Sequence, residues 1–332
     1  MPDLEIQEAR TTGELEALAP EWTRLWQRAR EATPFQTPAW LIPWWRHFGQ
    51  GELIVLCARD RDELVGLLPL YLLEEPPLRK LLPLGIGNSD WLDAICAPGR
   101  KRAIAAALLS AIAGRAGRFD VCDLQPLPAR SPLLEADAAG LADERIALGP
   151  CPALRLPAEG ALETGLPRAM RQNLRYYRRR AEKLGQLRFE AAHPGNLGEL
   201  LQALYALHGA RWRRQGLCGV LADEGVRSFH AEAAPALMAL GALRLYALRL
   251  DERIVAALYG FINKGRFHHY LAGFDPDLGK LGLGTLIVGH ALEQAAREGA
   301  GEFDFLRCGE AYKYRWGAVD RSSYGRRLRP LA

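Results

Sequence analysis

The most constraining feature of the sequence is the run 271–299, which reads LAGFDPDLGKLGLGTLIVGHALEQAAREG. It begins as an apolar strand, turns at Pro276, and passes through several glycines into a helical pattern. Glycine lets backbone N–H groups approach a ligand closely, and the start of a helix favours an anion. The run therefore predicts a strand–turn–helix unit. Its turn either binds a pyrophosphate or is simply a tight, glycine-rich connection.

The two halves of the chain share one order of predicted elements. In each half, helical patterns precede a set of apolar strands, and a further helix leads to one more strand. The residues 52–74 predict a hairpin in the first half, and 302–309 predict the last strand of the second. This order predicts an α/β fold with two domains, 1–160 and 161–332, each a mixed, largely antiparallel sheet flanked by helices.

Composition and cysteine spacing exclude several classes of protein. No stretch of eighteen apolar residues occurs in the 332 residues, which argues against a transmembrane helix. The N-terminal residues carry acids where a signal peptide would carry bases, so a cytoplasmic protein is expected. The six cysteines are scattered singly without metal-ligand spacing, and no metal is predicted. A net charge of +4 does not by itself predict a nucleic-acid partner.

Positive charge is nevertheless concentrated in one predicted helix, 166–184. Seven of the sixteen residues from Arg168 to Lys183 are Arg or Lys, among them Arg171 and Arg175. A solvated amphipathic helix is one interpretation. In the other interpretation, the positive side chains bind an acidic partner, namely CoA phosphates, an acyl carrier protein, tRNA or an anionic glycan precursor.

The glycine-rich turn resembles the acyl-CoA loop of GNAT acetyltransferases, which reads (Arg/Gln)-x-x-Gly-x-(Gly/Ala). Gly282-Leu283-Gly284 matches the second part, whereas Gly279 stands where Arg or Gln is usual and Lys280 follows it. Lys280 is therefore a candidate substitute cation for phosphate. The resemblance implies that this turn holds acyl-CoA as a co-substrate, with a binding set of Lys280, Gly282, Leu283, Gly284 and Thr285.

The run 303–317, FDFLRCGEAYKYRWG, resembles the signature of the CelD-type, FemAB-like branch of GNAT proteins. That signature reads Phe-Leu-Arg-Gly-x-Glu-x-Tyr-Lys-x-Arg-Trp-Gly, and Cys308 stands where its glycine is usual. Shorter matches occur at 34–49, 88–95, 207–216 and 273–276, so the resemblance touches both halves of the chain. It implies two GNAT-like domains in tandem, with acyl-CoA held in the second.

GNAT transfer is the direct attack of an amine on a thioester, helped by a base for the amine and an acid for the thiolate. Tyr312, just past the last strand, is the candidate acid, and packing is its structural alternative. Glu310 and Asp275 are candidate bases, although either could cap a turn or pair with a cation. His269 is a candidate base or substrate contact, and it could equally be structural.

The candidate substrate-binding residues are charged side chains beside the predicted strand ends and on the basic helix, namely Arg307, Lys313, Arg315, Asp90, Arg171 and Arg175. The resemblance favours an N-acyltransferase that takes acetyl or a longer acyl group from CoA to a small amine, such as an amino sugar or a polysaccharide precursor. One alternative is aminoacyl transfer from tRNA to a peptidoglycan precursor. Another is a catalytically silent accessory of an exopolysaccharide system.

Overall fold

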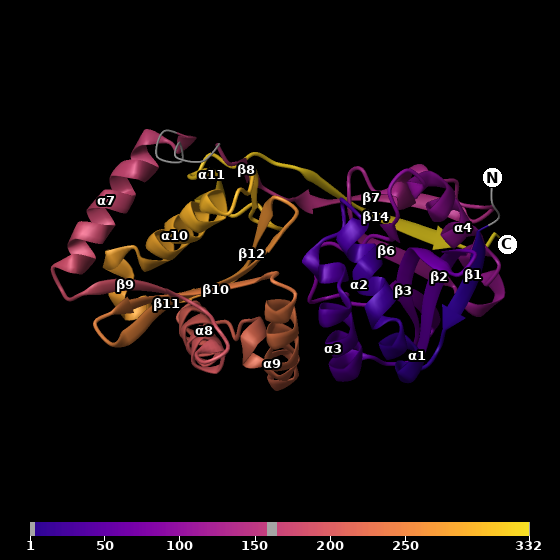
Figure 1. Ribbon diagram of the computed structural model, residues 1–332, viewed down its shortest axis with the longest axis horizontal. Helices are drawn as coiled ribbons and strands as arrows, with labels where there is room; N and C mark the ends of the chain where they lie inside the picture. Colours follow the sequence, from indigo (N-terminus) through magenta and orange to yellow (C-terminus); the bar gives the residue numbers. More distant parts are fainter. Residues whose placement is uncertain (1–3, 158–164, 332) are drawn as a thin grey trace. The chain divides into compact units, whose positions relative to one another are not determined.

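The computed structural model describes residues 4–157 and 165–331. Backbone contacts divide the chain into two units, residues 1–149 with 322–332, and residues 150–321. The predicted boundary between residues 160 and 161 lies outside the described residues. The two units are described separately below and are coloured by sequence in Figure 1.

The first unit is built on an eight-stranded sheet with the order β1-β2-β3-β4-β6-β14-β7, in which the short β5 pairs with β3. Its strands are β1 (Glu5–Ala9), β2 (Glu52–Asp60), β3 (Glu63–Glu75), β4 (Leu78–Pro83), β5 (Ile95–Cys96), β6 (Val121–Pro128), β7 (Ala142–Pro150) and β14 (Ser322–Arg329). Its helices are α1 (Thr12–Ala17), α2 (Ala19–Arg28), α3 (Pro38–Phe48), α4 (Lys101–Ala113) and α5 (Pro132–Glu135), with 3₁₀ turns η1 (Pro34–Gln36) and η2 (Ala116–Arg118).

Local sequence explains the start of this unit. The Thr11 side chain accepts a hydrogen bond from the N–H of Glu14, whose carboxylate accepts one in return, and this capping box begins α1. β2 and β3 form the predicted antiparallel hairpin. Nine consecutive residues of β3 are buried, because helices contact this strand and neighbouring strands border it. A continuous apolar run is what such a central strand requires.

The second unit has a six-stranded sheet with the order β8-β13-β12-β11-β10-β9. Its strands are β8 (Ala153–Arg155), β9 (Leu187–Ala191), β10 (Leu243–Leu250), β11 (Arg253–Asn263), β12 (Arg266–Phe274) and β13 (Glu302–Asp304). Its helices are α7 (Arg168–Glu182), α8 (Leu197–Arg213), α9 (Glu224–Ala239), α10 (Leu283–Arg297) and α11 (Ala311–Tyr314), with 3₁₀ turns η3 (Val220–Ala222) and η4 (Pro276–Leu281).

The helices of the second unit cover both faces of its sheet. Within this unit, Figure 1 shows α7 and α10 on one side of β9–β12, and α8 with α9 on the other. Both α8 and α10 contact β11 and β12. The core between α10 and the sheet is apolar and contains Phe267, Phe303 and Trp316.

The two sheets repeat one connection. In the first unit β4 and β6 are parallel and α4 lies between them in sequence. In the second, β12 and β13 are parallel and are connected through α10. On its other side β6 pairs with β14, and β13 pairs with β8 in the same way. Both of these pairs are antiparallel. The predicted mixed, largely antiparallel sheets flanked by helices are therefore present in both units.

β14 joins the first unit although it lies at residues 322–329 of the chain. Sequence reasoning did not predict this return, because the pairing of β14 with β6 joins residues about two hundred positions apart. Among the described residues, no helix is both long and apolar enough to cross a membrane.

Candidate functional site

The second unit contains a cavity of about 340 Å³, a volume suited to a small ligand. Its walls come from α7, α8, β12, α11 and the turn between η4 and α10. The lining consists of Met170, Asn173, Tyr177, Arg211, His269, Ala272, Phe274, Gly279, Gly282, Leu283, Gly284, Thr285, Val288, Tyr312, Arg315 and Trp316.

The start of α10 forms one wall of this cavity. Asp275 caps the preceding turn, since its Oδ1 accepts a hydrogen bond from the N–H of Asp277 at 2.9 Å. The Gly282 carbonyl accepts from the N–H groups of Thr285 and Leu286, at 2.9 and 3.0 Å. The preceding amides, at the first two helical positions, have no backbone acceptor among the described residues. This helix start therefore offers amide donors and a positive dipole end to an anion.

Gly282 is required at this turn for two reasons. Its φ of 61° is left-handed, a conformation that side chains disfavour. A Cβ on Gly282 would also lie 2.4 Å from Cγ of Tyr177, which packs against the turn from α7. The glycine thus allows α7 and the start of α10 to approach each other at the cavity wall.

His269 reaches the cavity from β12 and is 94% buried. Neither of its ring nitrogens has a hydrogen-bond partner in the part of the chain that the structure describes. Burial, helped by the charges of Lys313 and Arg211, lowers the pKa of His269 to about 3. The imidazole is therefore neutral at physiological pH. It keeps both a donor and an acceptor for a bound group.

Tyr312 lies beside His269, with ring centroids 6.5 Å apart in an edge-to-face arrangement. Phe305 packs against both rings, 5.9 Å from His269 and 6.3 Å from Tyr312. Burial, helped by the charge of Glu310, raises the pKa of Tyr312 well above its usual value. Its hydroxyl stays protonated in ordinary buffers and is a hydrogen-bond donor at the cavity wall.

Lys313 stabilises the loop that carries Tyr312 through hydrogen bonds to the loop backbone. The buried Lys313 ammonium donates to the carbonyls of Arg307 and Cys308, at 2.6 and 2.9 Å, and pairs with Glu310 at 2.8 Å. Leu306 and Cys308 have left-handed φ values of 60° and 75° in this loop. Lys313 therefore stabilises a strained turn that orients α11.

The fifteen predicted site residues do not all meet at the cavity. Seven line the cavity together, namely His269, Gly282, Leu283, Gly284, Thr285, Tyr312 and Arg315. Five lie next to it without lining it, namely Asp275, Lys280, Arg307, Glu310 and Lys313. Lys280 is exposed in η4, and Asp275 is a buried cap that pairs with Arg253. Asp90 lies in the first unit.

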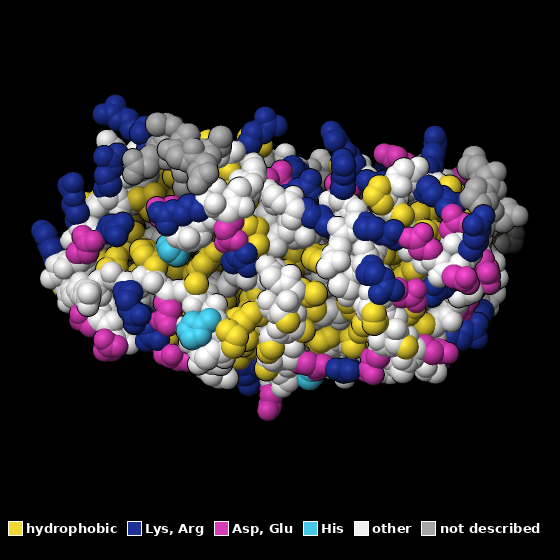
Figure 2. Space-filling view, viewed as in Figure 1, with side chains coloured by type: hydrophobic (Ala, Val, Ile, Leu, Met, Phe, Trp, Pro, Cys, Tyr) yellow, Lys and Arg dark blue, Asp and Glu magenta, His cyan; other side chains and the backbone are white. Residues whose placement is uncertain are grey.

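Arg171 and Arg175 lie on the face of α7 that points away from the cavity. With Arg168, Gln172, Tyr176 and Arg179 they line an open groove of about 490 Å³. Helical periodicity separates this set from Met170, Asn173 and Tyr177, which line the cavity. Figure 2 shows Lys and Arg side chains gathered where Figure 1 places α7.

Sequence reasoning missed Arg211, Tyr177 and Phe274 as cavity residues. The Arg211 guanidinium lies 5.2 Å from the centroid of Phe274 and 5.9 Å from that of Trp212. The motif LHGARWRRQG contains Arg211, but other arginines crowd the same helix end, and sequence alone does not identify the one that turns inward.

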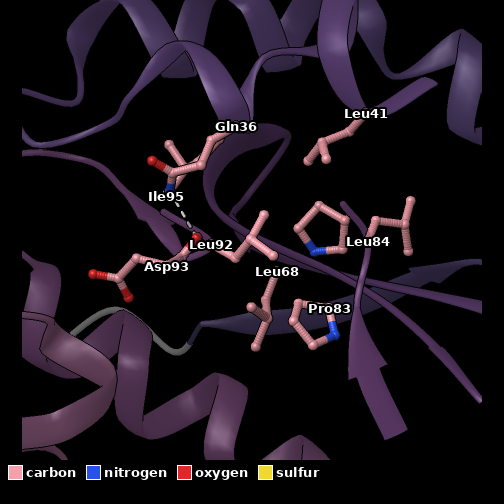
Figure 3. Close-up of a pocket in the computed structure, with 9 residues that line it drawn as sticks. Gln36, Leu41, Leu68, Pro83, Leu84, Leu92, Asp93 and Ile95 are labelled. Atoms are coloured by element: carbon pink, nitrogen blue, oxygen red, sulfur yellow. Dashed lines mark hydrogen bonds between the residues drawn. The ribbon is translucent and has the colours of Figure 1, made fainter. Parts of the chain in front are cut away.

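Two small hollows lie in the first unit. One, of about 10 Å³, lies between Leu41, Leu68, Pro83 and Leu92, and Figure 3 shows its mainly apolar walls. At its edge the Gln36 amide donates to the Asp93 carbonyl at 2.7 Å. A second, of about 20 Å³, lies beside Lys101 and Glu31. Each is large enough for about one water molecule.

No group of three or more His, Cys, Asp or Glu side chains in the described ranges could hold a metal ion. Four of the six cysteines are buried, and Cys218 and Cys308 are exposed.

Residues 168–314 match the family model of the acetyltransferase (GNAT) domain. Curated proteins give no match to the chain. Among solved structures, FemX aligns with a TM-score of 0.66 and 12% identity over 97% of this chain and 96% of its own. L-PGS from Bacillus licheniformis aligns with a TM-score of 0.60 and 14% identity, over 99% of this chain and 95% of its own. A tandem GNAT protein from the clavulanic acid biosynthesis pathway aligns with a TM-score of 0.51 and 15% identity, over 98% of each chain.

These likenesses establish the fold. The chain consists of two GNAT-like units in tandem, as the sequence predicts. The match to the acetyltransferase (GNAT) domain covers the segment from α7 to α11. The cavity lining lies within this segment, except for Arg315 and Trp316, which follow it directly.

Proposed function

We propose that this protein is an N-acyltransferase that moves an acyl group, with acetyl as the first candidate, from acyl-CoA to an amine. The observation that carries the proposal is the meeting of three groups in one cavity: the open start of α10, the neutral His269 and the protonated Tyr312. The match of residues 168–314 to the GNAT domain supports acyl transfer.

The start of α10 would hold the donor. The backbone amides of Leu283 and Gly284 and the dipole of a fifteen-residue helix suit the pyrophosphate of CoA. Gly279 has open space where a side chain would project, and Gly282 and Gly284 let the backbone approach the rings of Tyr177 and Phe274 closely. Lys280, exposed on the preceding turn, would add only a screened surface charge.

His269 would contact the attacking amine, and Tyr312 would contact the leaving sulfur. The amine nitrogen attacks the thioester carbonyl, so a C–N bond forms, the C–S bond breaks, and the amine loses a proton to solvent. A neutral His269 can accept a hydrogen bond from the amine and direct its lone pair. A pKa of about 3 suits this orienting role better than proton storage. The Tyr312 hydroxyl can donate its hydrogen bond to the departing sulfur.

The acceptor proposed from the run 303–317 is an amino sugar or another polysaccharide precursor, because that run resembles the CelD-type, FemAB-like branch. Arg315 lines the cavity and can contact this acceptor. The buried Lys313 would act indirectly by holding the loop that orients Tyr312.

The test combines binding with turnover. Acetyl-CoA at about 100 times its Kd should stabilise the native protein by about 2.7 kcal/mol in thermal unfolding. Tyr312→Phe should keep this binding and lower kcat by about tenfold or more, since it removes one donor to the sulfur. Tyr314→Phe is the matched control, because Tyr314 lies in the same short helix, is exposed and donates to Asp320. Equal turnover in both variants would refute the role of Tyr312, and no binding of any acyl-CoA would refute the donor.

A second candidate is an aminoacyl-tRNA-dependent transferase, which the FemAB-like resemblance implies. The arginine face of α7 favours it, since Arg168, Arg171, Arg175 and Arg179 lie along one exposed groove. Transfer from aminoacyl-tRNA with salt-dependent binding, and none from acetyl-CoA, would select this candidate. Donor binding without turnover of either donor would select a catalytically silent accessory protein.

A further inference from the structure

The charges of the cavity lining carry an inference about the acceptor, which rests on the acyltransferase proposed above. Two arginines, Arg211 and Arg315, are among the sixteen described residues that line the cavity, and none of these sixteen is Asp or Glu. His269, the other titratable base in the lining, is neutral at physiological pH. The cavity is therefore cationic, and the dipole of α10 adds to its positive potential.

Arg211 differs from Arg244 and Arg249, two other buried or partly buried arginines of the second unit. Arg249 pairs with Glu190 and Glu199, and Arg244 pairs with Glu298. Arg211 is half-buried between aromatic rings and makes no hydrogen bond or ion pair with any residue that the structure describes. Its guanidinium is held in place while its planar set of donors stays open, an arrangement that suits a carboxylate or a phosphate.

The position of Arg211 associates it with the reacting centre. Arg211, His269 and Tyr312 all line the same cavity. These two residues are the proposed contacts of the amine and the sulfur, whereas the pyrophosphate is assigned to the amides of α10. The thioester itself is uncharged. An anion beside Arg211 would therefore belong to the acceptor and not to the donor.

A simple amine suits this cavity poorly. It arrives in solution as an ammonium ion, and none of the described lining residues offers a carboxylate to attract it. Like charges repel strongly in a partly desolvated site, so the guanidinium of Arg211 disfavours such a cation. An amine with its own anionic group offsets this repulsion and gains a charge-assisted bidentate contact.

We propose that the acceptor is an anionic amine, a primary amine with a carboxylate or a phosphate a few bonds from its nitrogen, and that Arg211 binds the anionic group. The acyl group moves from sulfur to nitrogen, the thiolate gains one proton, and the ammonium releases two. No further reactant is needed. The shared chemistry is an anion next to an amine, and amino acids and amino sugar phosphates are its two sources.

The experiment compares matched acceptors with acetyl-CoA as donor. Glycine against glycinamide tests the carboxylate, and glucosamine 6-phosphate against glucosamine tests the phosphate. At least one anionic amine should show a kcat/KM about tenfold or more above that of its neutral partner. Arg211→Gln should abolish this preference by raising the KM of the acceptor, with the KM of acetyl-CoA unchanged. Arg213→Gln is the matched control, since Arg213 is exposed on the same helix outside the cavity lining.

Several results would overturn the inference. Neutral amines that react as well as anionic ones would do so, as would an Arg211→Gln variant that raises the KM of acetyl-CoA instead. Calorimetry without donor separates this inference from the proposed function. Binding of glycine or glucosamine 6-phosphate that is lost in Arg211→Gln supports the anion site even if acetyl-CoA does not bind. Absence of anion binding, with acetyl-CoA bound normally, overturns the site and leaves the donor intact.

Discussion

Each unit contains two parallel strands joined through a helix, β4–α4–β6 in the first and β12–α10–β13 in the second. The two units differ at the start of that helix. In the second unit α10 begins at the left-handed Gly282, beside a cavity of about 340 Å³. In the first, α4 follows Arg100, which pairs with Asp60 at 2.5 Å, and begins at Lys101, which lies 3.7 Å from Glu31. The hollow beside Lys101 measures about 20 Å³. The fold therefore repeats, whereas the space for a ligand depends on the residues at one helix start.

The largest expected effect comes from Gly282→Ala. The new Cβ would meet the Tyr177 ring, and the left-handed φ would add about 1 kcal/mol of strain. The start of α10 or the wall of α7 must then shift. We expect the Kd for acetyl-CoA, measured by calorimetry, to rise about tenfold or more, with a lower midpoint of thermal unfolding.

Gly99→Ala is the matched change in the first unit. Gly99 precedes α4 and has a φ of 80°, and a Cβ at this position would meet no atom within 4 Å beyond its own chain neighbours. The variant should lose stability through strain alone and keep its affinity for acetyl-CoA. Equal loss of affinity in the two variants would contradict the assignment of the ligand site to the second unit.

A smaller expected effect is a difference between the two units in how their stability depends on pH. Burial lowers the pKa of four histidines of the second unit, to about 4 for His208 and His290 and about 3 for His230 and His269. As pH falls below about 6.5 the unfolded chain binds protons that the native unit does not, so stability falls until the native pKa values are reached. Each such histidine costs about 2 kcal/mol at about pH 5 relative to neutral pH.

Hydrogen exchange measured separately in α10 and α4 should show this difference, with α10 losing protection more steeply between about pH 7 and pH 5. His290→Gln should flatten the slope for α10, since His290 stacks on Phe189 at 4.2 Å. His193→Gln, at an exposed position, should leave it unchanged. A pH slope that is the same in both helices would show that the buried histidines do not control it.

Sequence reasoning reached the parts of the fold and site that depend on local pattern. The strand, glycine turn and helix of 271–299 follow from residue spacing, and they correspond to β12, η4 and α10. The sequence left Asp275 as either a base or a turn cap and did not give the role of Lys313, because it shows a charge without its partners. In the structure Asp275 caps a turn and Lys313 donates to loop carbonyls.

Arg211 and β14 lay beyond sequence reasoning for different physical reasons. Arg211 turns inward because its helix packs on β12, a tertiary contact that no spacing within the helix reveals. β14 pairs with β6 across the length of the chain. Strand pairing at such separation depends on which edge is left open by the rest of the sheet, and local propensity carries no information about that edge.

The smallest expected effect tests whether the first unit has the opposite pH response. Burial raises the pKa of Asp93 to about 7, although Ser131 and the N–H of Ala94 donate to its Oδ1 at 2.7 and 2.8 Å. The native unit thus keeps a proton that the unfolded chain loses above pH 3.8, and stability declines as pH rises toward 7. Asp93→Asn keeps an oxygen for both donors and removes the titration. Protection of α4 should then be higher than in the parent protein at about pH 8 and similar at about pH 5, and lower protection at the higher pH would show that the Asp93 carboxylate stabilises the unit.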